Sequence, residues 1–396
     1  MLPYYLFFGF LFCISFFDLI KNDIQSKEKV EKILFFILWL VLIFFIGFRY
    51  KMANDWYNYE NLVKQVEPLN EVLFGNTPNF RSLQDVEYGF RILLSTVNLF
   101  FDPDEGSLQA LTVFVSIFCY TVLLNFTRKQ AIIPYKFIFL SVFISLSIFR
   151  EFDVLRQSIA LYIFLLSIKY FNNSFIKYSL LNLVGAMFHV SAIIFIPLYF
   201  LFRLKFSRPA IFVILALYMF SMVTRFSIVT SLISFLSNYF PELVLVRKLY
   251  FTSFEFETAG SFSVVGVVYG IFLLLLFFNY KKIDFSNYKI RLLINAFFIF
   301  IILNFLFSDS KEVADRLSYY FYIGLAFVFV YSIQFIPKTV ILPYMILIMA
   351  FPAIRFLRVL SNPMTAIVNI PYRNFLFRTP DDDDTILKNW QEKSTK

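Results

Sequence analysis

Long apolar runs recur along this chain of 396 residues, from residue 2 to about residue 356, and they constrain its fold more than any other feature. The hydrocarbon core of a bilayer is about 30 Å thick, and a helix needs about 20 mainly apolar residues to cross it. A membrane β-barrel would instead alternate apolar and polar residues in segments of about ten, and runs such as 33–48 do not alternate. With a mean hydropathy of +0.71 and only 16% charged residues, the sequence predicts an all-α polytopic membrane protein.

Clusters of Lys and Arg between the apolar runs predict how the chain crosses the membrane, because cytoplasmic loops are enriched in these residues. Placing the clusters in the cytoplasm gives about 12 transmembrane helices, within a range of about 10–13, and puts both chain ends outside. We expect residues 1–380 to form a single transmembrane domain. Residues 381–396 begin with four aspartates and are predicted to be a polar, disordered tail.

The densest charge between apolar runs lies in residues 150–156, and the only histidine of the chain, His189, follows after one further apolar run. A charged side chain at the centre of a membrane helix costs about 2.5–3.5 kcal/mol on insertion scales, so such residues usually have a function. We therefore predict that residues 150–189 form the wall of an extracytoplasmic active site.

The interval between Lys177 and Arg203 joins two basic clusters that both belong in the cytoplasm under the positive-inside rule. Two short helices that meet near His189 would keep both clusters inside and would raise the histidine to the outer surface. One tilted or kinked helix across this interval is the alternative, and it would leave Arg203 outside.

Two arginines at the outer ends of predicted spans are candidates for binding a diphosphate. Arg156 begins a span, where a bidentate guanidinium would add to the positive end of a helix dipole. The alternative is an ion pair with Asp153, three residues earlier on the same helix face. Arg316 follows Asp315 at the mouth of another span, so the same two interpretations apply to it.

Two residues are candidates for the general base. A neutral His189 could accept the proton of a sugar hydroxyl, although a lone histidine is also common as a hydrogen-bonded core residue. Asp55 precedes Trp56 and lies among aromatic residues that suit sugar rings, so it is the second candidate.

Other chemistries lack the required residues in this sequence. There is no glycine-rich phosphate loop and no Cys or His spacing typical of a metal site, so we expect no cofactor and no bound metal. The net charge of +9 comes without the fold signature of a nucleic-acid-binding protein, so we expect no nucleic acid partner. Residues 102–104 resemble the Asp-x-Asp motif of metal-using glycosyltransferases, but the proline and glycine around them favour a turn and helix cap.

Short motifs spread over nearly the whole chain resemble the EpsG-like family of Wzy-type polysaccharide polymerases. They are Phe48-Arg49, Asp55, Tyr59, Glu87, the Arg-Gln-x-x-Ala of residues 156–160, the His-x-Ser-Ala of residues 189–192, residues 315–321 and Pro371-Tyr372. The family commonly has a glycine before the loop aspartate, where this chain has Ala53-Asn54.

The resemblance implies an enzyme of the bacterial inner membrane with a GT-C-like architecture and extracytoplasmic active-site loops. Its substrate would be an undecaprenyl-diphosphate-linked oligosaccharide, which it would polymerise at the periplasmic face into O-antigen or a related surface polysaccharide, beside a flippase and a chain-length regulator. The implied site comprises His189 and Asp55 as catalytic residues and Arg49, Arg156, Arg316, Tyr59, Glu87, Gln157 and Tyr372 as binding residues. A lipid-linked oligosaccharide flippase and an O-antigen ligase are the alternatives.

Overall fold

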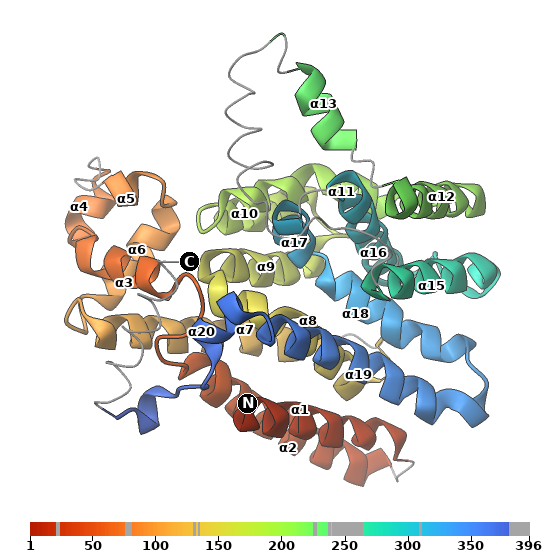
Figure 1. Ribbon diagram of the computed structural model, residues 1–396, viewed down its shortest axis with the longest axis horizontal. Coiled ribbons are helices and arrows are strands. Elements are labelled where there is room, and N and C mark those ends of the chain that lie inside the picture. The colour runs from red at the N-terminus through yellow and green to blue at the C-terminus, as the bar shows by residue number, and fades with distance from the viewer. Residues whose placement is uncertain are drawn as a thin grey trace. The chain divides into compact units, whose positions relative to one another are not determined.

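The computed structural model in Figure 1 describes residues 1–379 apart from residues 21–23, 76–80, 130–131, 134, 225–227, 237–238, 240–263 and 309–310. Every regular element in the described part of the chain is a helix, and one isolated antiparallel bridge joins Arg49 to Asn374. The predicted all-α class is therefore confirmed.

The chain divides into two compact units, each assembled from separate segments. Unit 1 comprises residues 1–131, 135–199 and 349–396, and unit 2 comprises residues 132–134 and 200–348. The predicted boundary between a domain and a tail at residue 380 lies outside the described residues and stays a prediction.

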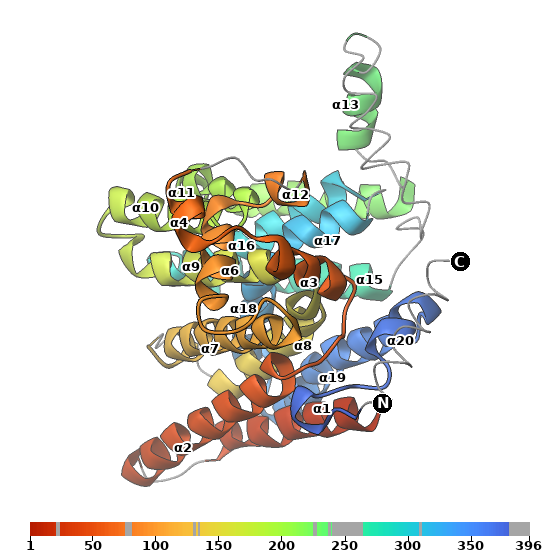
Figure 2. The ribbon, with the colours of Figure 1, turned by 90° about the vertical axis from the view of Figure 1, so that its left-hand side faces the viewer.

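Unit 1 contains the N-terminal helices and the last part of the chain. Its helices are α1 (Leu2–Ser15), η1 (Phe16–Leu19), α2 (Ile24–Leu42), η2 (Ile43–Gly47), α3 (Trp56–Gln65), α4 (Leu69–Leu73), α5 (Arg81–Gln84), α6 (Tyr88–Val97), α7 (Glu105–Lys129), α8 (Lys136–Asp153), α9 (Leu155–Ser167), η3 (Ile168–Tyr170), α10 (Phe175–Ala186), η4 (Val190–Ile194), α20 (Pro363–Asn369) and η9 (Phe375–Phe377). Both views show α1 and α2 side by side (Figures 1 and 2).

Unit 2 contains the helices of the middle of the chain. They are α12 (Arg208–Thr224), α13 (Ile228–Leu236), α15 (Val264–Phe278), η6 (Tyr280–Lys282), α16 (Tyr288–Leu306), α17 (Lys311–Tyr319), α18 (Tyr322–Tyr331), η7 (Ser332–Phe335) and η8 (Lys338–Val340), and α11 (Phe195–Arg203) and α19 (Ile341–Leu360) each have residues in both units. Close packing of α16 on α18 depends on Gly324, because a Cβ there would lie 2.5 Å from the Phe297 nitrogen.

Five helices in the described part of the chain are long and apolar enough to cross a bilayer. They are Leu2–Leu19, Lys27–Gly47, Glu105–Lys129, Tyr288–Leu306 and Lys338–Leu360, and Val313–Tyr319 with Tyr322–Phe335 make a sixth if this pair, bent by 67°, is one span. The chain is thus a helical membrane protein, as predicted. Twelve spans stay a prediction, because several other apolar helices are shorter, such as Phe175–Ala186 with 12 residues.

The chain reverses direction at His189, as the charge pattern predicted. His189 has an extended backbone between α10 and η4, with φ −155° and ψ 115°. After this turn the Tyr199 ring lies 4.7 Å from that of Phe175, and the Tyr178 hydroxyl donates to the Phe195 carbonyl at 2.9 Å. Residues before and after His189 are therefore paired antiparallel, which confirms a hairpin of two short helices and excludes one kinked helix.

Candidate functional site

The carboxylate of Glu87 joins three distant segments of unit 1. Its Oε2 lies 2.6 Å from Nη1 of Arg156, at the start of α9. Its Oε1 lies 3.0 Å from Nδ1 of His189 and accepts the backbone N–H of Val190 at 3.1 Å. The three side chains are partly accessible, with exposed fractions of 14% for Glu87, 26% for Arg156 and 28% for His189, so the cluster borders open space.

The charge of Glu87 determines which residue donates in its hydrogen bond with His189. Burial alone would raise the pKa of Glu87, but the hydrogen bond with His189 and the charge of Arg156 lower that pKa to about 2. Since the carboxylate is therefore ionised at neutral pH and can only accept, Nδ1 of His189 must donate to it. In a neutral imidazole this leaves the lone pair on Nε2, which is the arrangement a general base requires.

The helix that presents Glu87 touches the hairpin turn directly. Glu87 is the N-cap of α6, and the N–H of Gly89, two residues later, donates to the Met187 carbonyl at 2.9 Å. A Cβ at Gly89 would lie 2.8 Å from that carbonyl oxygen, so only glycine fits without a shift. Sequence reasoning missed this residue, although glycine is the usual residue where the backbone must approach another group closely.

The Asp55 loop is held against the same side of the site. The Asn54 backbone N–H donates to the Asp153 carboxylate at 2.6 Å, so Asp153 fixes this loop instead of pairing with Arg156. Asp55 is the N-cap of α3. Burial and the nearby charge of Asp55 raise the pKa of Tyr59 to about 12. Arg156 has the opposite effect on this pKa, and the Tyr59 side chain is hydrogen-bonded to it. Asp55 and Tyr59 thereby join the cluster around Arg156.

Ala53 adopts a backbone conformation that favours glycine. Its φ is +76°, in the left-handed region, which costs an L-residue with a Cβ roughly 1–2 kcal/mol. The resemblance anticipates a glycine just before the loop aspartate, and the left-handed backbone supplies the physical reason for it.

A model of the EpsG family matches residues 32–374 of the chain. The chain belongs to the EpsG family. None of the curated proteins and none of the solved structures compared with it matches. The match confirms the resemblance, and the family is associated with polysaccharide polymerases.

Two other predicted site residues of this EpsG-family chain, Arg49 and Tyr372, donate to backbone carbonyls within unit 1. Arg49 is 1% exposed, and its guanidinium donates to the Ile46 carbonyl at 2.7 Å and the Phe152 carbonyl at 3.0 Å. The Tyr372 hydroxyl donates to the Phe45 carbonyl at 2.8 Å. Gln157 is buried in the first turn of α9, and Arg316 lies in unit 2 on α17.

The described residues of this EpsG-family protein contain no group of three or more His, Cys, Asp or Glu side chains that could hold a metal ion. The alternative that residues 102–104 form a helix cap is confirmed, since the Asp104 carboxylate accepts the Gly106 N–H at 2.7 Å at the start of α7. Arg156 is the residue of this cluster that suits an anionic ligand. Its guanidinium carries five N–H donors and has donors left beyond those that bind Glu87 and Tyr59.

Proposed function

We propose that this EpsG-family protein polymerises undecaprenyl-diphosphate-linked oligosaccharide repeat units into O-antigen or a related surface polysaccharide. The reaction is a glycosyl transfer. The growing glycan leaves its diphosphate and joins the non-reducing end of a new lipid-linked repeat unit. The contact of Glu87 with both Arg156 and His189 carries this proposal, because one carboxylate holds a candidate base and an anion-binding guanidinium close together.

His189 takes the proton of the acceptor hydroxyl in this scheme. Glu87 holds Nδ1, so Nε2 receives the proton while the hydroxyl oxygen bonds to the anomeric carbon. As that bond forms, the bond from the anomeric carbon to the diphosphate oxygen breaks. The negative charge that develops on the leaving diphosphate is stabilised by Arg156, and the proton on His189 is later released to solvent or to the product.

Three further predicted residues have roles in this proposal. Tyr59 keeps its proton at neutral pH and is held beside Arg156, so it orients the guanidinium. Asp55 lies at the same side and is the alternative base. Arg316 is proposed to act as a second diphosphate-binding arginine.

The cellular setting is part of the same proposal. We propose an inner-membrane protein with about 12 spans in a GT-C-like architecture, whose site faces the periplasm and which works beside a flippase and a chain-length regulator. The hairpin at His189 supports this setting, because it turns the chain back so that the Tyr199 ring lies beside that of Phe175, as a cytoplasmic position for the basic clusters on both sides of the hairpin requires.

Lipid-linked and lipid A-linked glycans from a strain that lacks this protein test the proposal. A polymerase predicts lipid A core capped with single repeat units and no long chains. Uncapped polymer on the lipid carrier would indicate a ligase instead. Repeat units trapped on the cytoplasmic leaflet would indicate a flippase.

A further inference from the structure

An apolar groove of about 710 Å³ lies on the N-terminal helix pair of unit 1. It is lined by the first half of α1, by the end of α2 with η2, and by residues 371–379, of which we call residues 371–378 the strap. Its volume lies within the range of about 300–1,000 Å³ that is typical of small-molecule sites. Both α1 and α2 are candidate membrane spans, and Leu6 and Phe44 in the lining are 65% and 41% exposed, so the groove opens toward the surface that lipid would cover.

The strap is bonded along its length to the segment that follows η2 and to the start of α7. The Tyr50 N–H donates to the Arg373 carbonyl at 3.1 Å, and the Phe375 N–H donates to the Phe48 carbonyl at 2.7 Å. Further along, Arg378 lies 3.5 Å from the carboxylate of Glu105.

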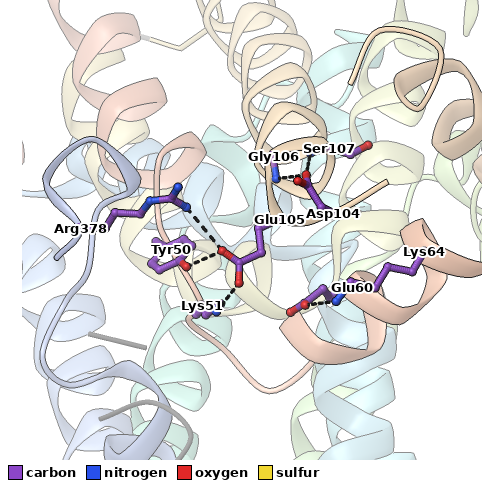
Figure 3. Close-up of polar contacts among 9 residues, drawn as sticks. All are labelled: Tyr50, Lys51, Glu60, Lys64, Asp104, Glu105, Gly106, Ser107 and Arg378. Carbon is purple, nitrogen blue, oxygen red and sulfur yellow. Dashed lines mark hydrogen bonds and ion pairs between the residues drawn. The ribbon is translucent and has the colours of Figure 1, made fainter. Parts of the chain in front are cut away.

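Figure 3 shows that this Glu105 carboxylate also meets Lys51 and the Tyr50 hydroxyl, the latter at 2.7 Å. One acid thus ties the strap to the loop that leads to Asp55. These contacts fix one wall of the groove within unit 1.

Opposite ends of the groove differ in polarity. Stacked rings form one wall, with centroids 4.2 Å apart for Phe7 and Phe45 and 4.5 Å apart for Phe45 and Tyr372. The apolar lining continues along α1 to Phe10. At the strap, the lining includes Arg373, whose side chain donates to the Lys51 carbonyl at 3.4 Å and whose residue is 5% exposed. A ligand with a long hydrocarbon chain and an anionic end would match both parts.

Packed side chains connect the wall of the groove to the residues that support the site described above. The Phe45 ring lies 6.4 Å from the ring of Phe152. Phe152 directly precedes Asp153, which holds the Asn54 backbone beside Asp55. A chain bound in the groove would thus be anchored on the segment that leads into the Asp55 loop.

We propose that this groove binds the polyprenyl chain of the lipid-linked glycan, with the diphosphate end toward Arg373. The proposal rests on the proposed function for the identity of the lipid. Bulk phospholipid has the same two-part chemistry. However, a groove that adjoins the site favours the lipid whose diphosphate must reach that site.

Photocrosslinking with a polyprenyl diphosphate that carries a photoreactive isoprenoid tests this directly, using the full-length protein in phospholipid nanodiscs. We expect crosslinks to peptides of α1, the end of α2 and the strap, which unlabelled undecaprenyl diphosphate displaces and phosphatidylglycerol at the same concentration does not. Displacement by both lipids equally, or crosslinks elsewhere only, would overturn the proposal.

A pair of neighbouring substitutions separates the groove from the rest of α2. Val41→Trp fills the groove, whereas Leu40→Trp places the same side chain at a residue that is 46% exposed and outside the lining. A tryptophan that occupies part of the groove should weaken polyprenyl diphosphate binding at least about fivefold in the Val41 variant, and the Leu40 variant should bind as the wild type does. Equal binding by both variants contradicts the groove.

Polymerisation measured on the same samples distinguishes the two proposals. A protein that polymerises normally but crosslinks elsewhere would refute the groove and keep the function. A protein that binds the probe in the groove but never extends a glycan would refute the function and keep the groove.

Discussion

Replacing Glu87 by glutamine tests the ionic centre of the site. The amide oxygen of Gln still accepts hydrogen bonds from Val190 and His189, but the side chain no longer carries the charge that faces Arg156 at 2.6 Å. The pKa of Glu87 is about 2 instead of 4.5, and one pKa unit corresponds to about 1.4 kcal/mol, so the surroundings favour the ionised form by about 3 kcal/mol. Glu87→Gln should therefore lower the free energy of unfolding at neutral pH by up to about 3 kcal/mol.

The pH dependence of this difference has a definite sign. Because the folded-state pKa of Glu87 lies below its ordinary value, the stabilisation is fully present above pH 4.5 and is lost as pH falls toward about 2. Unfolding of the purified protein in mild detergent should show the wild type and Glu87→Gln converging across this window.

Glu28→Gln is the matched control for this experiment. Glu28 pairs with Lys32 one turn along α2 at 2.7 Å, and the two side chains are 66% and 57% exposed, so the substitution should change the free energy of unfolding little. If Glu87→Gln is as stable as Glu28→Gln at neutral pH, or differs from the wild type equally at every pH, the ionic contact with Arg156 does not hold this site together.

Three further substitutions test other parts of the account. Gly89→Ala should lower the free energy of unfolding by about 1–3 kcal/mol, because its Cβ would lie 2.8 Å from the Met187 carbonyl oxygen. Gly9→Ala is the control, since a Cβ there would have nothing within 4 Å. Equal effects of the two substitutions on stability would argue against the close contact at Gly89. Ala53→Gly should raise the free energy of unfolding by about 1 kcal/mol, since φ is +76° there, and a loss of stability would contradict this conformation. Arg156→Lys keeps the charge but loses the forked donors, so glycan chain length at matched protein level should fall nearly as far as in Arg156→Ala; full activity in the lysine variant would reduce Arg156 to a point charge.

Much of the fold could be predicted from the sequence because its signals are local. Apolar runs gave the helices, and the spacing of basic clusters correctly predicted the hairpin at His189. The number of spans is harder to predict, since helices such as α12, with 17 residues, are too short for length alone to decide. The bend of 67° between α17 and α18 also follows from no local signal that we recognised.

For the candidate site, the sequence indicated which residues lie in the cluster but not which of them contact one another. Asp55, Tyr59, Glu87, Arg156 and His189 were all expected, and the structure brings them together in unit 1. Their partners depend on contacts between segments that are far apart in the chain, and sequence spacing does not encode these. Spacing suggested Asp153 for Arg156, whereas Glu87, 69 residues away, is the partner observed.

The most direct test of the central claim is polymerisation by the purified protein in vesicles that contain polyprenyl-diphosphate-linked repeat units. The wild type should extend these units into long chains. His189→Gln keeps a polar side chain of similar size but cannot take the proton, so it should insert normally, bind the lipid and extend chains about 10²–10⁴ times more slowly. Extension by His189→Gln at close to the wild-type rate would contradict His189 as the base and leave Asp55 as the next candidate.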